Sequence, residues 1–299
     1  CCTSTASTSC RSATSATCST STGPPTRSPP AQRALEIADE VGDRTRNGLL
    51  LANIGLAHLA VGDWDAAASV LFPSAGPATK IDVQMLATAQ ALCLALRGDA
   101  AGARAVLDPS VAVSDLEDPH DRAALATTSA FVALADGDVH AAFHHAMASV
   151  DELGSARGLP FGGDDGRWAW PLAARLAHEL GHDDVQLDLV ARLDAEPKGT
   201  PARMQLAESE LIRARLADRR GEPDTAERYA TAIAMLRADG TPYHLAHALL
   251  DHADHLRRSG DPLMADELTA EAVELARRLR CAPLLARAGA ARDATHLAT

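Results

Sequence analysis

Aromatic residues make up only 3% of this 299-residue chain, although 46% of its residues are hydrophobic. A core built from such a sequence must consist mainly of alanine, leucine and valine, and alanine and leucine are strong helix formers. In windows such as 86–97 and 206–216, apolar residues recur at three- and four-residue spacing and do not alternate with polar ones. We therefore expect an all-α protein without β-strands.

Clustered positive charge and long apolar runs are also missing. The net charge is −12, and the lysines and arginines are dispersed among acidic residues, so we expect no direct binding to nucleic acid. No run approaches the roughly eighteen apolar residues that span a bilayer, and no charged start followed by an apolar core marks a secretory signal. These absences predict no membrane segment, and a cytoplasmic location is the default expectation.

The sequence contains no recognisable catalytic or cofactor-binding signature. The glycines of the segment 159–166 are not followed by the lysine of a phosphate-binding loop, so we interpret this segment as an insertion between repeats. Acidic pairs such as Asp164–Asp165 and Asp183–Asp184 lack a nucleophile with an orienting partner. Four of the six cysteines lie in the first twenty residues, and no C-x-x-C pair occurs. We expect neither an enzyme nor a metal or cofactor site.

What the chain does contain is a repeated turn. A glycine that is followed by an acidic residue, either directly or after one intervening residue, recurs at intervals of 36, 39, 44, 40 and 39 residues. The six landmark glycines are Gly62, Gly98, Gly137, Gly181, Gly221 and Gly260. Such a period indicates helix-turn-helix units that bury their apolar faces against neighbouring units. The glycine suits the end of one helix, and the acidic residue suits the start of the next.

Small residues accompany each turn at fixed offsets. Seven residues before the landmark glycines stand Gly55, Ala91, Ala130, Ala174, Ala214 and Ala253. Five residues after them stand Ala67, Ala103, Ala142, Gln186, Ala226 and Ala265. Because small side chains allow close approach, we expect the two helices of each unit to cross at these sites. Only Gln186 departs from the pattern.

The turns divide the chain into two regions and predict helix boundaries. Residues 1–30 are almost entirely Ser, Thr, Cys, Pro and Ala, which predicts a disordered segment that is either a linker or an artefact. Residues 31–299 form the repeat domain, and the chain is expected to be part of a longer protein. Helix pairs are predicted near 44–61 with 63–72, 80–97 with 99–108, 119–136 with 138–153, 167–180 with 183–195, 201–220 with 223–238 and 242–259 with 262–280, followed by a capping helix from Pro283.

These features resemble the tetratricopeptide repeat. The best match is the stretch 51–58, Leu-Ala-Asn-Ile-Gly-Leu-Ala-His, followed by Gly-Asp-Trp-Asp-Ala-Ala at 62–67. Trp170 stands where the family has a tryptophan in its first helix, whereas His58 and Ala133 stand where it often has tyrosine. The resemblance covers roughly residues 44–290. It implies a right-handed α-solenoid of about six tetratricopeptide-like repeats with a C-terminal capping helix.

In this family the first helices of the repeats form an inner groove that binds protein or peptide partners. In this sequence, the corresponding positions are apolar in the first three repeats and charged in the last three. The apolar half of the groove suits an amphipathic helix, and the charged half suits a polar peptide or ligand. Alternatively, the apolar half packs on further repeats. The candidate groove residues are Leu49, Leu56, Met85, Leu92, Phe131, Trp168, Arg175, Arg215, Arg219, His247, Arg257 and Arg258.

A histidine stripe lies in the predicted helix 242–259. His244, His247, Asp251 and His255 share one helical face, and His252 lies beside them. Such a stripe could bind zinc or respond to pH, but it lacks the glutamate of a metalloprotease motif, and histidines are common on half-buried helix faces. We expect no metal here.

The closing stretch, 241–253 through 271–288, resembles the end of ATP-dependent bacterial regulators. In these proteins an ATPase module precedes a helical repeat array, with a nucleotidyl cyclase domain in front or a LuxR-type DNA-binding domain behind. The ending Leu-Arg-Cys-Ala-Pro-Leu-Leu at 279–285 favours the cyclase-linked type. The resemblance implies a regulatory arm that binds a protein, a peptide or a small molecule and biases an ATPase in the same parent chain. The alternatives are part of a LuxR-type regulator and a stand-alone adaptor.

Overall fold

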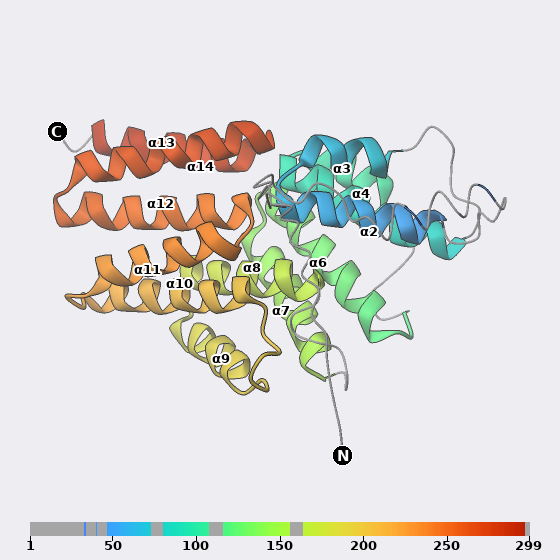
Figure 1. The fold of residues 1–299 in the computed structure, drawn as a ribbon, viewed down its shortest axis with the longest axis horizontal. Helices are drawn as coiled ribbons and strands as arrows, with labels where there is room; N and C mark the ends of the chain where they lie inside the picture. Colours follow the sequence, from blue (N-terminus) through green and yellow to red (C-terminus); the bar gives the residue numbers. More distant parts are fainter. Residues whose placement is uncertain are drawn as a thin grey trace, which may run out of the picture.

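A computed structural model describes residues 47–72, 80–107, 116–155 and 164–296, together with Arg33 and Glu40. Within these ranges the chain forms thirteen helices, α2 to α14, and no strand (Figure 1). The expectation of an all-α protein is therefore confirmed for the described part of the chain. The predicted disordered segment 1–30 lies outside the described residues.

The helices follow one another in pairs that pack side by side. Their bounds are α2 Asn47–Val61, α3 Trp64–Leu71, α4 Lys80–Arg97, α5 Ala100–Val106, α6 Pro119–Ala135, α7 Val139–Ser155, α8 Asp164–Leu180, α9 Asp183–Asp194, α10 Arg203–Arg220, α11 Thr225–Asp239, α12 Pro242–Ser259, α13 Pro262–Leu279 and α14 Ala282–His296. Most ends agree with the sequence-based prediction to within a few residues. The exception is the predicted insertion 159–166, since residues 164–166 already belong to α8.

The landmark glycines end their helices in the way the sequence predicts. All six have positive φ angles, between 66° and 93°, which glycine adopts without the steric cost that a Cβ atom imposes. The acidic residue that follows acts as an N-cap in four turns. The carboxylates of Asp63, Asp99, Asp138 and Asp261 each accept a hydrogen bond from the backbone N–H three residues later. Each glycine-aspartate pair therefore ends one helix and begins the next.

Most of the small residues are buried, and the exception is Ala226 in α11, which is only partly buried. Ala91, Ala130, Ala174, Ala214 and Ala253 are fully buried, and so are Ala67, Ala103, Ala142 and Ala265. The exception to the pattern, Gln186, is also fully buried, and its amide donates to Asp183 over 3.3 Å. Trp170 is buried as well and donates from Nε1 to the carbonyl oxygen of Leu189 in α9. The fixed offsets thus mark core positions.

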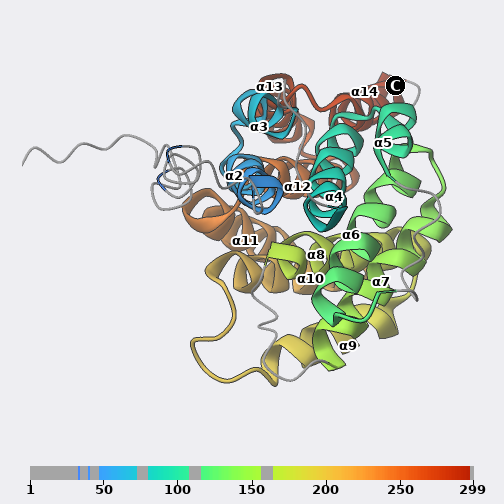
Figure 2. The ribbon, with the colours of Figure 1, turned by 90° about the vertical axis from the view of Figure 1, so that its right-hand side faces the viewer.

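The two ends of the described array meet, which the repeat pattern did not predict. The first helices lie against α12, α13 and α14 in both views (Figures 1 and 2). The Cys281 thiol donates to the carbonyl oxygen of Leu96 over 3.1 Å, although 185 residues separate them. Arg280 pairs with Asp65 across 3.0 Å, and the ring of Tyr243 lies 6.0 Å from that of Trp64. The helix pairs therefore curve until the first contacts the last.

None of the described helices combines the length and the hydropathy needed to cross a bilayer.

The crossing of α2 and α3 provides a test of the packing. A Cβ atom added to Gly55 would lie 2.4 Å from two carbon atoms of Leu71, whose side chain is fully buried and would have to shift. We expect Gly55→Ala to destabilise the protein by about 1–3 kcal/mol through overpacking, despite the higher helix propensity of alanine. Chemical unfolding followed by circular dichroism measures this change.

Gly154 in α7 is the matched control, because nothing lies within 4 Å of an added Cβ atom there. Gly154→Ala should leave stability unchanged or slightly increased. Equal stability of the two variants would show that the α2–α3 crossing is not tightly packed.

Candidate functional site

Three cavities lie along the face formed by α2, α4, α6, α8, α10 and α12, the first helices of the six pairs, which we call the inner face. Ten of the twelve candidate groove residues line them. Leu56, Met85 and Leu92 line the first cavity, Phe131, Trp168, Arg175, Arg215 and His247 the second, and Arg219 and Arg258 the third, which Arg175 also borders. Leu49 and Arg257 line none of the three. The inner face is thus a row of separate cavities.

The first cavity, which we call the apolar cavity, has a volume of about 210 Å³ and lies between α2, α4 and α6. Its walls are Ala52, Leu56, Met85, Thr88, Ala89, Leu92, Ala124, Thr127 and Thr128. Asn53, His120, Asp121 and Asp165 also line it. His120 Nδ1 lies 3.5 Å from a carboxylate oxygen of Asp165 at the start of α8. The lining therefore combines apolar side chains and three threonines with two acidic side chains and a histidine.

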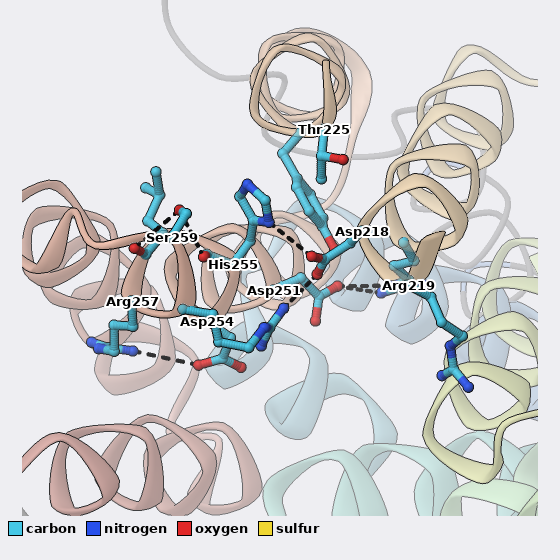
Figure 3. A network of polar contacts seen from close by, with 12 residues as sticks. Asp218, Arg219, Thr225, Asp251, Asp254, His255, Arg257 and Ser259 are labelled. Carbon is cyan, nitrogen blue, oxygen red and sulfur yellow. Dashed lines mark hydrogen bonds and ion pairs between the residues drawn. The ribbon is translucent and has the colours of Figure 1, made fainter. Parts of the chain in front are cut away.

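The third cavity, the charged cavity, has a volume of about 480 Å³ and lies among α8, α10, α11, α12 and α14. The arginines at its edge are engaged with neighbouring groups of the chain itself. Arg258 pairs with Asp218, and Arg219 lies 3.2 Å from Asp183 while also donating to the carbonyl oxygen of His178. Arg257 in α12 pairs with Asp254 (Figure 3), and it also pairs with Asp266 in α13. These arginines mainly hold helices together.

The most deeply buried of these links joins three helices. The Asp251 carboxylate in α12 accepts hydrogen bonds from Arg215 Nε and Nη2 in α10, over 2.8 and 2.6 Å, and its other oxygen accepts from Arg287 in α14. Burial alone would raise the pKa of Asp251, but the two guanidinium groups outweigh burial and hold it well below its usual range. Arg215, Asp251 and Arg287 are separated by 36 residues each, close to the repeat interval. This equal spacing is the signal by which the sequence could have revealed the link.

The histidine stripe does not converge on one point. His244 shares a hydrogen bond with Thr241, His247 Nδ1 lies 2.8 Å from an Arg287 nitrogen, and His255 pairs with Asp218. His252 stacks on Tyr229 with ring centroids 5.3 Å apart. Within the described residues, no group of three or more histidine, cysteine or acidic side chains is placed to hold a metal ion. The stripe packs α12 against its neighbours.

The second cavity, the central cavity, lies between the other two. Phe131, Trp168 and Tyr243 form its aromatic wall, and Arg175, Glu208, Arg215 and His247 supply its polar groups. The rings of Phe131 and Trp168 lie edge to face with centroids 6.0 Å apart. Sequence reasoning placed Phe131 and Trp168 on the inner face but did not identify Tyr243, because this residue belongs to the last repeat and meets the aromatic rings of earlier ones only when the array curves.

The buried carboxylate of Asp251 gives a testable prediction. Asp251→Asn removes the carboxylate to which the buried Arg215 donates two hydrogen bonds and should destabilise the protein by about 3–5 kcal/mol. The matched control is Asp188→Asn, which removes an ion pair with Arg192 on the surface and should cost about 0–1 kcal/mol. Urea unfolding of both variants compares the two costs, and similar values would show that the buried link is not a principal stabilising contact.

The buried histidines predict a pH dependence of stability. Burial is the main cause that lowers the pKa of His244 to about 3 and of His178 and His252 to about 4. The unfolded chain therefore takes up protons below about pH 6.5, the ordinary histidine value, before the folded chain does, so these groups reduce stability as the pH falls from 6.5 towards 4. Glu208, whose pKa burial raises to about 7, acts in the opposite direction over part of this window.

His252→Phe isolates one contribution, since it keeps a ring on Tyr229 and removes the titrating group. Chemical unfolding at pH 4, 5 and 6.5 should show a shallower loss of stability in the variant than in the unmodified chain, by up to about 1.4 kcal/mol per pH unit. Parallel curves would contradict the assignment of His252 as a neutral buried group.

A comparison with models of protein families gave no match for this chain. A comparison with curated proteins also gave none. Neither comparison assigns the chain to a family, so the cavities described above are interpreted from their own geometry.

Proposed function

We propose that this chain is a ligand-sensing repeat scaffold, a right-handed tetratricopeptide-like α-solenoid of about six repeats capped by α14, which binds a small molecule in the apolar cavity. The helix pairs with their glycine-aspartate turns support the solenoid. The apolar cavity is the observation that supports binding. Side chains from the first helices of three successive pairs line it, as in repeat proteins that bind partners on their inner face.

The size and lining of the apolar cavity define the chemical class of ligand. An engineered protein cavity of about 150 Å³ binds benzene, so a volume of about 210 Å³ accommodates a group somewhat larger than a benzene ring. Asp121 and Asp165 contribute carboxylates to its lining, and an amine or hydroxyl group matches their oxygens. The proposed ligand therefore has a compact apolar body and a positively charged or hydrogen-bond-donating end.

The charged cavity is a weaker candidate although it is larger. Its arginines pair with acidic side chains or carbonyl oxygens of the chain itself, and a ligand anion would have to replace those contacts. Charge reversal of Arg219 or Arg258 would therefore change the stability of the fold as well as any binding. In the apolar cavity the corresponding contact is that of Asp165 with His120 over 3.5 Å, which is longer than the arginine–carboxylate contacts of the charged cavity.

Binding in the apolar cavity can be transmitted to the end of the chain. The cavity walls include α2 and α4. Trp64 of α3, the partner of α2, lies beside Tyr243 at the start of α12, and Leu96 of α4 accepts a hydrogen bond from Cys281, just before α14. A ligand that separates or draws together α2 and α4 changes the free energy of these contacts, because it binds one arrangement better than the other. This coupling supports the role of a regulatory arm in a larger ATP-dependent bacterial regulator, of the cyclase-linked type.

Blocking the cavity tests the binding function. We expect 2-phenylethylamine to bind the chain saturably and more tightly than toluene, which lacks the amine that Asp121 and Asp165 would bind. Ala124 lines the cavity from α6, so Ala124→Phe fills it and should weaken 2-phenylethylamine binding at least tenfold. Ligand-observed NMR measures these affinities.

The control is Ala230→Phe, which adds the same side chain at an exposed position of α11. Undiminished binding by Ala124→Phe, or equal losses in both variants, would contradict the assignment of the apolar cavity as the binding site.

The role as a regulatory arm has a separate test. The open reading frame that encodes this chain should also encode an ATP-binding module with a phosphate-binding loop. A reading frame with the repeat domain alone would instead support a stand-alone adaptor, and one with a LuxR-type DNA-binding domain would support a transcriptional regulator.

A further inference from the structure

The central cavity contains a convergence of buried polar groups that the proposed function does not use. It lies one helical turn from the apolar cavity along α6, since Thr127 lines one cavity and Phe131 the other. Its free volume of about 10 Å³ is that of one water-sized group, and it is partly open to solvent. A single oxygen atom therefore fits into it.

Three nitrogen atoms in the residues around this cavity have no hydrogen-bond partner in the described structure: Arg175 Nη2, Arg215 Nη1 and His247 Nε2. These residues are 9%, 1% and 8% exposed. Arg175 Nη1 donates to Glu179, and Arg215 Nε and Nη2 donate to Asp251. His247 Nδ1 accepts from Arg287, so its Nε2 carries the hydrogen.

A buried hydrogen-bond donor without an acceptor destabilises the protein, and a charged donor does so more than a neutral one. Two guanidinium groups and one imidazole N–H around a cavity for one oxygen atom form a site for a negatively charged oxygen. Trp168 and Tyr243 also line the cavity, and because it is partly open to solvent, the rest of a bound molecule would lie outside it. A carboxylate fits better than a phosphate, because it is planar, carries one charge and needs to insert only one oxygen.

We propose that the central cavity binds the carboxylate group of a small organic acid, with one oxygen held by Arg175, Arg215 and His247. This site is independent of the apolar cavity, and either can exist without the other.

Glu208 would make this binding depend on pH. It is 2% exposed, lines the cavity and faces Arg175, Arg215 and Asp251, with His244, His247 and Tyr243 on the α12 side. Burial is the main cause that raises the pKa of Glu208 to about 7, against the opposing effect of Arg215. A carboxylate bound beside it repels the ionised form, so binding is favoured when Glu208 is protonated. The affinity should therefore rise several-fold between pH 8 and pH 6, where the ligand itself stays ionised.

The test is an NMR titration of the full chain with isotope-labelled acetate and propionate at constant ionic strength, with acetamide as the neutral analogue. We expect saturable binding of the acids and none of acetamide. Arg175→Met should weaken acetate binding about tenfold or more, whereas Arg213→Met, which removes a surface arginine of α10 paired with Asp194, should not change it. Circular dichroism confirms that each variant is folded.

Glu208→Gln is the variant least expected to disturb folding, since it keeps the shape of the side chain. It should bind acetate at least as tightly as the unmodified chain at pH 8 and remove the pH dependence. No saturable binding of either acid would mean that the cavity holds only water and would overturn the proposal. Equal binding of acetamide would also overturn it, as would preferential binding of inorganic phosphate that depends on Arg175. None of these results bears on the binding of 2-phenylethylamine in the apolar cavity.

Discussion

The packing of Tyr243 at the start of α12 is the contact on which the shape of the inner face depends. Its ring lies about 6 Å from those of Trp64, Phe131 and Trp168, which come from α3, α6 and α8. In a chain with few aromatic residues, this cluster joins the first, middle and last helix pairs. Tyr243 lines the central cavity together with Phe131 and Trp168, so this proposed binding site depends on the curvature that brings the ends together.

Buried ions add a second constraint on the same helices. Asp251 cannot stay ionised inside the protein without partners, and it obtains them from α10 and α14. The pairing also fixes how far each helix can slide along its neighbour, since a shift by one turn would separate the charges. Arg215, Arg219 and Arg258 of the charged half therefore have a structural role, since each pairs with a carboxylate of another helix. The donors left over by this network define the central cavity.

Local features of the fold could be predicted from the sequence because they recur. Gly62, Gly98 and the other landmark glycines need positive φ angles, and their neighbours Asp63 and Asp99 cap the next helix, so both the turns and the helix ends follow from short stretches. The same offsets identified Leu56, Met85 and Leu92, which line one cavity.

The long-range features could not be read in this way. The contact between Cys281 and Leu96 depends on the small rotation between each helix pair and the next, added over the whole array. The sequence of one repeat does not determine this total rotation. Likewise, the sequence shows Arg215 as a charged residue on the inner face but does not show that Asp251 neutralises it. Whether a charge binds a ligand or a neighbouring helix is decided by tertiary packing.

The proposed ligand site lies on the inner face of this helical array, between α2, α4 and α6. A crystal structure of the chain soaked with 2-phenylethylamine would show whether it exists. If it does, electron density for the ring is expected among Leu56, Met85 and Leu92, with the amine beside Asp121 or Asp165. Density for the compound at another position, or an apolar cavity filled by side chains of the chain itself, would rule out this site.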